Sequence, residues 1–309
     1  MRRRPSTSSR AGGTALGLVL AQVVPPVPDR AHPVARFGTL MTWVEDLLWA
    51  DDRRSGIRYA ATGAVIGAVG GRLLGSTSAA VSVATAGRQL REVATGIGTH
   101  LEAGDLDAAR AALPSLVGRD PSTLDASGIA AAVVESVAEN MVDAVYAPAL
   151  WALAGGPAGA GLYRALNTMD AMVGHRSERH ERFGWAAARA DDLANLVPAR
   201  VLALCVVALT PAERRAETVR AIREDAPAHP SPNAGVAEAA FAGALGVSLG
   251  GPLRYGDRRE DRPTLGAGDR PVVADIARAV RLAEQAELVL IASMAALAVL
   301  TVRPRRRRR

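Results

Sequence analysis

The chain has 309 residues, of which 49% are hydrophobic but only 4% aromatic, and it contains 30 glycines. That composition favours close packing between helices over a β-rich core. The single cysteine, Cys205, excludes an intrachain disulfide and a zinc site built from cysteines. All 37 basic residues are arginine, against 31 acidic residues, and the lack of lysine excludes a P-loop nucleotide site.

The net charge of +6 comes from the two ends of the chain. The arginines that account for it are Arg2, Arg3, Arg4, Arg10, Arg303 and those at 305–309. Positive charge beside apolar segments stays in the cytoplasm and attracts anionic lipid, so these tails predict membrane anchoring with both termini cytoplasmic. We expect the tails, 1–10 and 303–309, to be disordered. We expect no nucleic-acid partner, and the alternative is binding of nucleic acid by the C-terminal RPRRRRR tail.

Uncharged apolar runs recur along the chain, at 11–28, 59–71, 73–87, 144–163, 201–212 and 288–302. Pro25 and Pro26 break the first run, Arg72 separates the second from the third, and Gly155-Gly156-Pro157 interrupts the fourth. The number of runs and their flanking arginines predict several membrane crossings. The crossings must be even in number if both tails are cytoplasmic. The alternatives are a soluble protein with buried helices and a cleaved N-terminal secretory signal.

Polar segments separate these runs. Residues 88–113 have the helical spacing of a surface helix, and Asp120 and Asp125 precede predicted helix starts. Residues 226–233 form a Pro-rich connection to an Ala-rich helix, and 250–270 form a Gly/Pro/Arg loop. No strand pattern stands out. The predicted fold is all-α: one polytopic helical membrane domain over 1–309, with amphipathic helices and loops on the cytoplasmic side.

Glu135, Glu139 and Asp143 follow one another at intervals of four, which places three carboxylates on one helical face beside Asn140. Like charges at this spacing destabilise a plain helix, and desolvation beside an apolar run adds to the cost. Such carboxylates generally meet a cation, a metal or a cavity. The sequence therefore predicts a Mg²⁺ site or a general base here, against a structural pairing with arginines of another helix.

Two further groups follow on the next polar stretch. Asn167 and Asp170 share a helical face, and Arg176 has the planar guanidinium that binds phosphate in bidentate fashion. Asp191 and Asp192 lead into an apolar helix and offer the oxygen ligands that Mg²⁺ prefers. The alternative for the aspartate pair is favourable placement at a helix N-terminus.

Ser231 and Asn233 precede the Ala-rich helix. Either can cap its N-terminus, and a helix N-terminus preceded by small residues is also an anion site. Phosphate groups of a nucleotide would then meet arginines, helix N-termini and Mg²⁺ rather than a P-loop lysine.

Long blocks of the chain, in this order, resemble the CobD/CbiB family, the membrane-bound adenosylcobinamide-phosphate synthases of cobalamin biosynthesis. The blocks are HPVARFG (32–38), 113–156 with its VVESVAENMVDAVYAPALWALAGG, YRALNTMDAMVGHRSERHERFGWAAARADDLANLVPAR (163–200), and HPSPNAGVAEAAFAGALGVSLGGPLRY (229–255). The resemblance implies ATP- and Mg²⁺-dependent amide synthesis. A propionate carboxyl of adenosylcobyric acid would be joined to (R)-1-aminopropan-2-ol or its O-phosphate.

With that chemistry in view, each group of residues has an expected role. The candidate catalytic residues are Glu135, Glu139, Asn140, Asp143, Asn167 and Asp170. The candidate substrate- or phosphate-binding residues are Arg176, Arg189, Arg200, Ser231 and Asn233, and the candidate Mg²⁺ ligands are Asp191 and Asp192. Activation of the carboxylate needs charge neutralisation on phosphate, and a carboxylate would take the proton from the attacking amine.

Two other classes of function fit intramembrane carboxylates: a transporter or channel subunit, and a non-catalytic scaffold for corrinoid enzymes. A transporter is expected to show repeated halves and longer spans, and neither occurs here. The resemblance places the site at the cytoplasmic edge of the cell membrane, where ATP is available.

Overall fold

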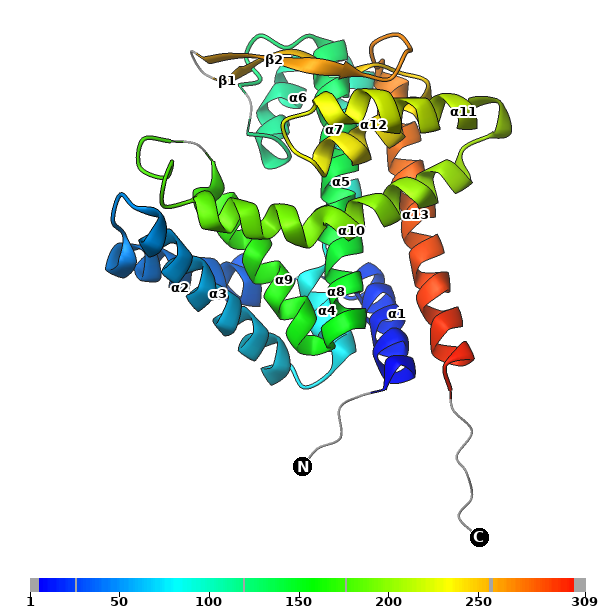
Figure 1. Cartoon of the computed structure of the whole chain (residues 1–309). Coiled ribbons are helices and arrows are strands. Elements are labelled where there is room, and N and C mark those ends of the chain that lie inside the picture. Colours follow the sequence, from blue (N-terminus) through cyan, green and yellow to red (C-terminus); the bar gives the residue numbers. More distant parts are fainter. Residues whose placement is uncertain (1–5, 26, 119, 176, 256–257, 303–309) are drawn as a thin grey trace. The chain divides into compact units, whose positions relative to one another are not determined.

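The computed structural model describes residues 6–25, 27–118, 120–175, 177–255 and 258–302. Helix accounts for 78% of the structure, which confirms the all-α prediction. The chain divides into two compact units. Unit 1 comprises Met1–Thr85, Ala147–Ala194 and Val289–Arg309, and unit 2 comprises Ala86–Tyr146 and Asn195–Leu288. The division falls within helices α10 (Trp185–Leu209) and α13 (Val273–Leu300). Figure 1 labels the elements.

All regular elements in the described part of unit 1 are helical. Its elements are α1 (Thr7–Val23), a 3-10 turn (Asp29–Ala31), α2 (Pro33–Leu48), α3 (Arg53–Leu73), α4 (Thr77–Ala84), α8 (Ala147–Gly155), α9 (Pro157–Met169) and a π turn (Asp170–Gly174), with parts of α10 and α13. Helix α1 ends before the Pro25 break, as predicted, but it begins at Thr7, so the last residues of the expected N-terminal tail are helical. Gly156 has φ +64° and precedes Pro157, which separates α8 from α9 at the predicted interruption.

Small residues bring α3 and α9 into close contact, and Figure 1 shows the two helices side by side. A Cβ at Gly67 would lie 2.6 Å from the carbonyl oxygen of Gly161 and would overlap Ala165. A Cβ at Gly71 would overlap the backbone of Pro157. The two backbones can therefore approach only because these positions lack side chains, which is the packing mode of helices in membranes.

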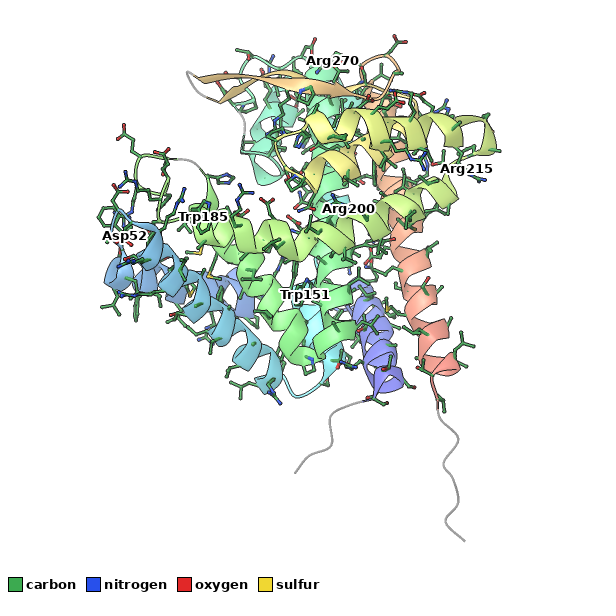
Figure 2. The ribbon with its side chains drawn as sticks, viewed as in Figure 1. Asp52, Trp151, Trp185, Arg200, Arg215 and Arg270 are labelled. Atoms are coloured by element: carbon green, nitrogen blue, oxygen red, sulfur yellow. The ribbon has the colours of Figure 1, made fainter. Side chains whose placement is uncertain are left out.

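Larger side chains fill the rest of the core of unit 1. Tyr59 of α3 packs on Phe183 with ring centroids 5.1 Å apart, and both are fully buried with Tyr163. The indole Nε1 of Trp151 on α8 donates to the carbonyl of Ala194 on α10 at 3.0 Å, and Figure 2 shows this tryptophan. These contacts position the polar residues of α9 and of the start of α10.

Unit 2 is built around α7 and α12. Its elements are α5 (Gly87–Glu102), α6 (Leu106–Ala112), a 3-10 turn (Leu113–Ser115), α7 (Ala126–Met141), a π turn (Val142–Tyr146), α11 (Ala212–Arg220), a π turn (Ala221–Asp225), a 3-10 turn (Ala226–Ala228), α12 (Ala234–Leu245), β1 (Leu249–Tyr255) and β2 (Arg258–Leu265). Asp125 caps α7 by accepting from the N–H of Gly128 at 2.7 Å, as predicted. Asp120 starts no helix; its carboxylate accepts from the N–H of Ser122 in a turn.

The predicted surface helix over 88–113 is two helices. Gly104 adopts φ +75° after α5, and Asp105 caps α6 by accepting from the N–H of Ala108. The apolar spacing continues across this break, so periodicity alone suggested one helix. A left-handed glycine followed by a capping aspartate is the local pattern that ends it.

The region predicted as a loop over 250–270 contains an antiparallel hairpin, β1–β2, with Leu249 opposite Leu265. Both leucines are buried. Gly250 has φ +80°, and a Cβ there would overlap the carbonyl of Pro263. The glycine, proline and arginine content hid the strands, because hairpin pairing here depends on the close approach at Gly250 rather than on alternating apolar residues.

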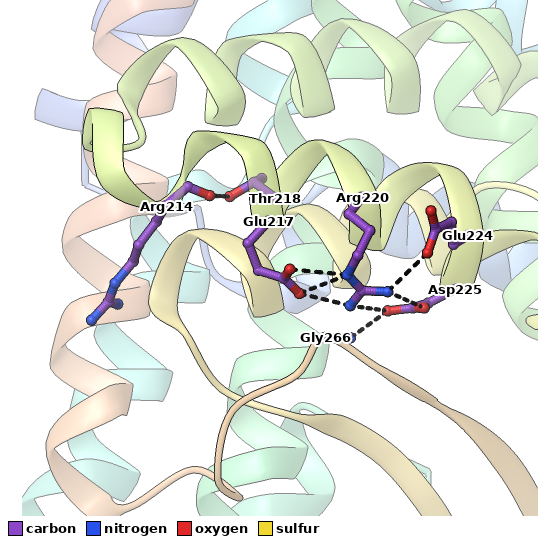
Figure 3. Close-up of polar contacts among 7 residues, drawn as sticks. All are labelled: Arg214, Glu217, Thr218, Arg220, Glu224, Asp225 and Gly266. Atoms are coloured by element: carbon purple, nitrogen blue, oxygen red, sulfur yellow. Dashed lines mark hydrogen bonds and ion pairs between the residues drawn. The ribbon is translucent and has the colours of Figure 1, made fainter.

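Arg220 links the end of α11 to this hairpin, as Figure 3 shows. Its guanidinium binds Glu217 at 2.6 Å, Glu224 at 3.3 Å and Asp225 at 3.0 Å. Asp225 in turn accepts from the backbone N–H of Gly266 at 2.9 Å. One guanidinium therefore bridges three carboxylates, and Asp225 holds the end of β2 against the π turn.

Two helices, α10 and α13, are long and apolar enough to cross a membrane. Only 39% and 33% of their most apolar windows are buried, so most of each window faces outward. The apolar runs at 201–212 and 288–302 fall within or overlap these helices. The other predicted runs lie in helices that do not meet both requirements of length and hydropathy within the described residues.

Candidate functional site

Glu135 is buried, with 3% of its surface exposed, and its Oε1 accepts from the backbone N–H of Gly250 at 2.8 Å. This contact holds the start of β1 against α7 within unit 2. The first of the predicted carboxylates is therefore hydrogen-bonded to the protein backbone. The contact depends on the close approach of Gly250 to α7.

Glu139 is one turn further along α7 and is exposed. Beside it, the Asn140 amide donates to the carbonyl and to the hydroxyl of Ser136, at 2.9 and 3.0 Å. The two glutamates share a helical face as predicted. Glu135 is buried on that face, whereas Glu139 is exposed. Glu139 is therefore the glutamate of this face that a substrate in solution can reach.

Asp143 lies in the π turn that follows α7, where the sequence predicted an uninterrupted helix. Its Oδ1 accepts from the Asn195 amide at 3.1 Å. A π turn inserts an extra residue into the helix and changes the direction of the side chains beyond it, and such turns often occur at functional sites. The sequence grouped Asn195 with Asp191 and Asp192 by helical spacing, and its contact with Asp143 was not predicted.

A second polar group of unit 2 surrounds the start of α12. Arg200, shown in Figure 2, donates to the Asn233 amide oxygen at 2.7 Å. The hydroxyl of Ser231 accepts from the N–H groups of Asn233 and Ala234 at 3.3 and 3.1 Å, so this serine, rather than the side chain of the N-cap residue Asn233, satisfies the first N–H of the helix. The predicted phosphate-binding residues Arg200, Ser231 and Asn233 thus come together in the structure.

Behind this cap lies a buried pair, His229 and Glu238, that was not among the predicted site residues. His229 Nε2 is 3.8 Å from Glu238 Oε2, and both side chains are almost fully buried. His229 Nδ1 accepts from the N–H of Ser231 at 3.1 Å. The histidine therefore supports the turn that carries the capping serine. Glu238 lies in an Ala-rich helix, where a lone acid is the available sequence signal.

Unit 1 holds a separate row of polar side chains on α9 and α10. Arg164 Nη1 donates to the Asn167 amide oxygen at 2.8 Å, and the Asn167 amide nitrogen lies 3.5 Å from Asp191 Oδ1, which is long for a hydrogen bond. Asp191 is buried. Of this row, sequence reasoning found Asn167 and Asp191 but missed Arg164.

The other predicted residues of unit 1 have more local contacts. Arg189 forms an i,i+3 ion pair with Asp192 at 3.6 Å on α10. Asp170 lies in the π turn after α9, and its carboxylate sits over Gly174, where a Cβ would overlap it. Arg176, predicted to bind phosphate, lies outside the described residues.

The segment around residue 180 is attached to α2 by a contact that the sequence did not suggest. Arg179 Nε and His180 Nε2 both lie 3.0 Å from Glu45 Oε1. Arg179 also stacks on Trp49, with its guanidinium carbon 4.8 Å from the ring centroid. Burial alone would raise the pKa of Glu45, but the hydrogen bonds and charges of His180 and Arg179 outweigh it and hold this pKa below its ordinary value.

The carboxylates of the candidate site could supply only part of the ligand shell of a hard cation. Among the described residues, no three side chains of the His, Cys, Asp and Glu types are grouped to hold a metal. Mg²⁺ commonly takes only one or two carboxylates and completes its shell with water and phosphate oxygens. In both carboxylate–amide pairs the asparagine turns its nitrogen toward the aspartate, so the oxygen ligands available to Mg²⁺ are the carboxylates of Asp191 and Asp143, each of which fits a shell completed by water and phosphate.

Fold and site together define an all-α protein that has two candidate membrane-crossing helices and carboxylate–amide pairs at helix turns. Residues 14–283 match the family model described as CobD/Cbib protein. A protein of Mycobacterium tuberculosis named Cobalamin biosynthesis protein CobD is 47% identical over 315 residues, covering 96% of this chain and 97% of the relative. Proteins of the same name from Rhodobacter capsulatus (47% over 200 residues, 64% of this chain and 63% of the relative) and Rhizobium meliloti (39% over 292 residues, 87% and 89%) are also similar.

The chain therefore belongs to the CobD/CbiB family, and its role lies in cobalamin biosynthesis. The expectation of family membership is confirmed. No solved structure matches the chain.

Proposed function

We propose that this protein is an amide-forming ligase, which joins a propionate carboxyl of adenosylcobyric acid to (R)-1-aminopropan-2-ol or its O-phosphate with consumption of ATP. The observation that carries the proposal is the family match over residues 14–283, which contains every predicted site residue. A carboxylate does not react with an amine until it is activated, and activation by ATP generates charge that the arginines and carboxylate–amide pairs of this chain are suited to balance.

Within unit 2, Arg200 and the capped start of α12 would bind a phosphate group. The Arg200 guanidinium is already oriented by Asn233, and the N–H groups at a helix N-terminus favour an anion. Glu139, which is exposed, would accept the proton that the attacking ammonium loses. Asn140, held by Ser136, would position a polar group of the substrate beside it.

Within unit 1, Asp191 and Asp192 would contribute oxygen ligands to Mg²⁺, which neutralises phosphate charge when it is bound, and Asn167 would position the Asp191 carboxylate. Arg164 orients the Asn167 amide so that its nitrogen faces Asp191. Asp170 would orient substrate from the neighbouring π turn. Each of these roles is a proposal for the residue in its own unit.

We also propose that the protein is a multi-pass protein of the cell membrane, with its active site and both termini in the cytoplasm. Large apolar side chains on the outer faces of its helices support this location. Leu204 of α10 is 71% exposed and Leu300 of α13 is 83% exposed. Exposed apolar side chains at this density are costly in water and favourable in lipid. The arginine-rich tails support the cytoplasmic assignment.

The test is product formation by membranes that contain the full chain. They would be given adenosylcobyric acid and MgATP with either aminopropanol or its phosphate, and the corrinoid products would be separated by mass. We expect an amide product with one of the two amines and none without ATP. A chain that accumulates in the membrane but forms no amide with either amine would instead be a scaffold or transporter.

A further inference from the structure

Helices α2, α3, α4 and α9 of unit 1 enclose an apolar cavity of about 280 Å³. Phe37, Leu40, Ile66 and Val83 contribute apolar walls. Gly70 also lines the cavity, and a Cβ there would meet no described atom within 4 Å. The space therefore exists partly because α3 has a glycine at this position.

The cavity opens on an apolar exterior. Leu40 belongs to its lining and is itself 40% exposed. Val69 and Leu73, which flank the lining residues of α3, are 50% and 81% exposed. A ligand that enters from this side comes from apolar surroundings, so the hydrocarbon of a membrane fits better than bulk water.

Two arginines, Arg36 and Arg164, line the same cavity, and its described lining has no carboxylate to balance them. Arg164 uses Nη1 to orient Asn167, whereas its Nε is buried and has no hydrogen-bond partner among the described residues. The positive charges of Arg164 and Arg36 have no carboxylate among the described lining residues, and an oxyanion in the cavity would balance them.

We propose that this cavity binds an anionic phospholipid, with an acyl chain against Phe37, Ile66 and Val83 and the phosphate held by Arg36 and Arg164. A corrinoid or an amino alcohol phosphate is too polar for these walls. An amphiphile with one anionic head matches both the apolar lining and the two positive charges. The inference rests on the membrane location proposed above and is independent of the reaction.

The site is tested on the full-length protein purified in a mild neutral detergent. Phosphatidylglycerol would be titrated while the thermal midpoint is followed, with phosphatidylcholine and glycerol 3-phosphate as separate arms. Native mass spectrometry would count the lipids retained. We expect phosphatidylglycerol to raise the midpoint, and phosphatidylcholine and the soluble head group to have little effect. Equal shifts with both lipids, or a full shift with glycerol 3-phosphate, would overturn the proposal.

Variants locate the binding. Gly70→Leu places a side chain at a lining position where a Cβ meets nothing within 4 Å, and it is expected to abolish the phosphatidylglycerol shift. Gly96→Leu is the matched control, because Gly96 on α5 also faces open space but lies in unit 2. Arg36→Gln changes an exposed side chain and should weaken phosphatidylglycerol binding by about tenfold, as expected for one charged hydrogen bond. If Gly70→Leu misfolds, the Arg36→Gln variant is the remaining test. Unchanged affinity of the Arg36→Gln variant for phosphatidylglycerol would refute the site.

Discussion

Glu135 and Glu139 are one helical turn apart on α7, yet one is buried against the N–H of Gly250 and the other is exposed. Under the proposed function, this difference favours Glu139 over Glu135 as the carboxylate that exchanges a proton with substrate. Burial, rather than spacing, thus selects Glu139 as the candidate base.

Glu139→Gln should leave folding unchanged, because the side chain is exposed, and should lower amide synthesis by roughly 10²- to 10⁴-fold, the usual contribution of a general base. The rate of product formation in membranes, normalised to protein content, measures the effect. Glu92→Gln is the matched control: Glu92 is an exposed helical glutamate of the same unit, paired with Arg88, and its loss should not change the rate. Full activity of the Glu139→Gln variant would remove Glu139 from the mechanism.

The contact of Glu45 with Arg179 and His180 should make the thermal stability of the protein depend on pH. The pKa of Glu45 is held below its ordinary value of 4.5 in the folded protein. The contact therefore stabilises the fold above about pH 4.5 and loses its effect as the pH falls through the lower folded pKa. The midpoint difference between wild type and Glu45→Gln should be largest near neutral pH and shrink below about pH 4.5. A difference that grows on acidification would contradict this origin.

At the scale of elements, the contact of α3 with α9 depends on individual glycines. Gly67→Ala places a methyl group against Ala165 and the carbonyl of Gly161, and should cost about 1–3 kcal/mol of stability, as overpacking generally does. Gly70→Ala, one turn away in open space, should be neutral or gain up to about 1 kcal/mol of helix propensity. Chemical or thermal unfolding in detergent measures both. Equal effects at the two positions would show that the helices are not closely packed at Gly67.

Elements also show where sequence patterns were sufficient and where they were not. The Asp125 cap, the break at Gly156-Pro157 and the helix after Ser231 follow from local backbone preferences, so they could be predicted. The hairpin at 249–265 could not, because Gly250 and Asp225 secure it by contacts with residues far along the chain. The π turn at Asp143 was missed for a similar reason, since the residues of a π turn do not differ in propensity from those of an α-helix.

At the scale of the whole molecule, unit 2 constrains the membrane crossings. Helix α12 has 12 residues, fewer than a crossing needs, and it packs against α7 within this unit, so we expect both helices to lie on one side of a bilayer. If α10 crosses between them, residues 147–184 must supply a compensating crossing. By the same logic, a complete crossing by α13 would place the C-terminal arginines on the side opposite α12.

Two reporters test this arrangement. One inserted after Ala267, an exposed residue beyond β2, should report a cytoplasmic location, because the proposed reaction uses ATP. One fused after Arg309 should also be cytoplasmic, as the arginine-rich tail predicts. Protease protection of right-side-out and inverted vesicles is the measurement. A periplasmic C-terminus would instead establish α13 as a complete crossing and overturn the even number of crossings expected from the tails.

By itself the sequence determined the helical class, the family and the polar residues from which the site is built, because composition, helix spacing and long ordered blocks are properties of the chain. Only the tertiary structure decided the state of each acid: Glu135 against a hairpin backbone, Glu139 exposed, Asp143 on Asn195, and Asp191 beside Asn167. Burial and hydrogen-bond partners arise from segments that are distant in sequence, and they determine which carboxylate can hold a cation, move a proton or do neither.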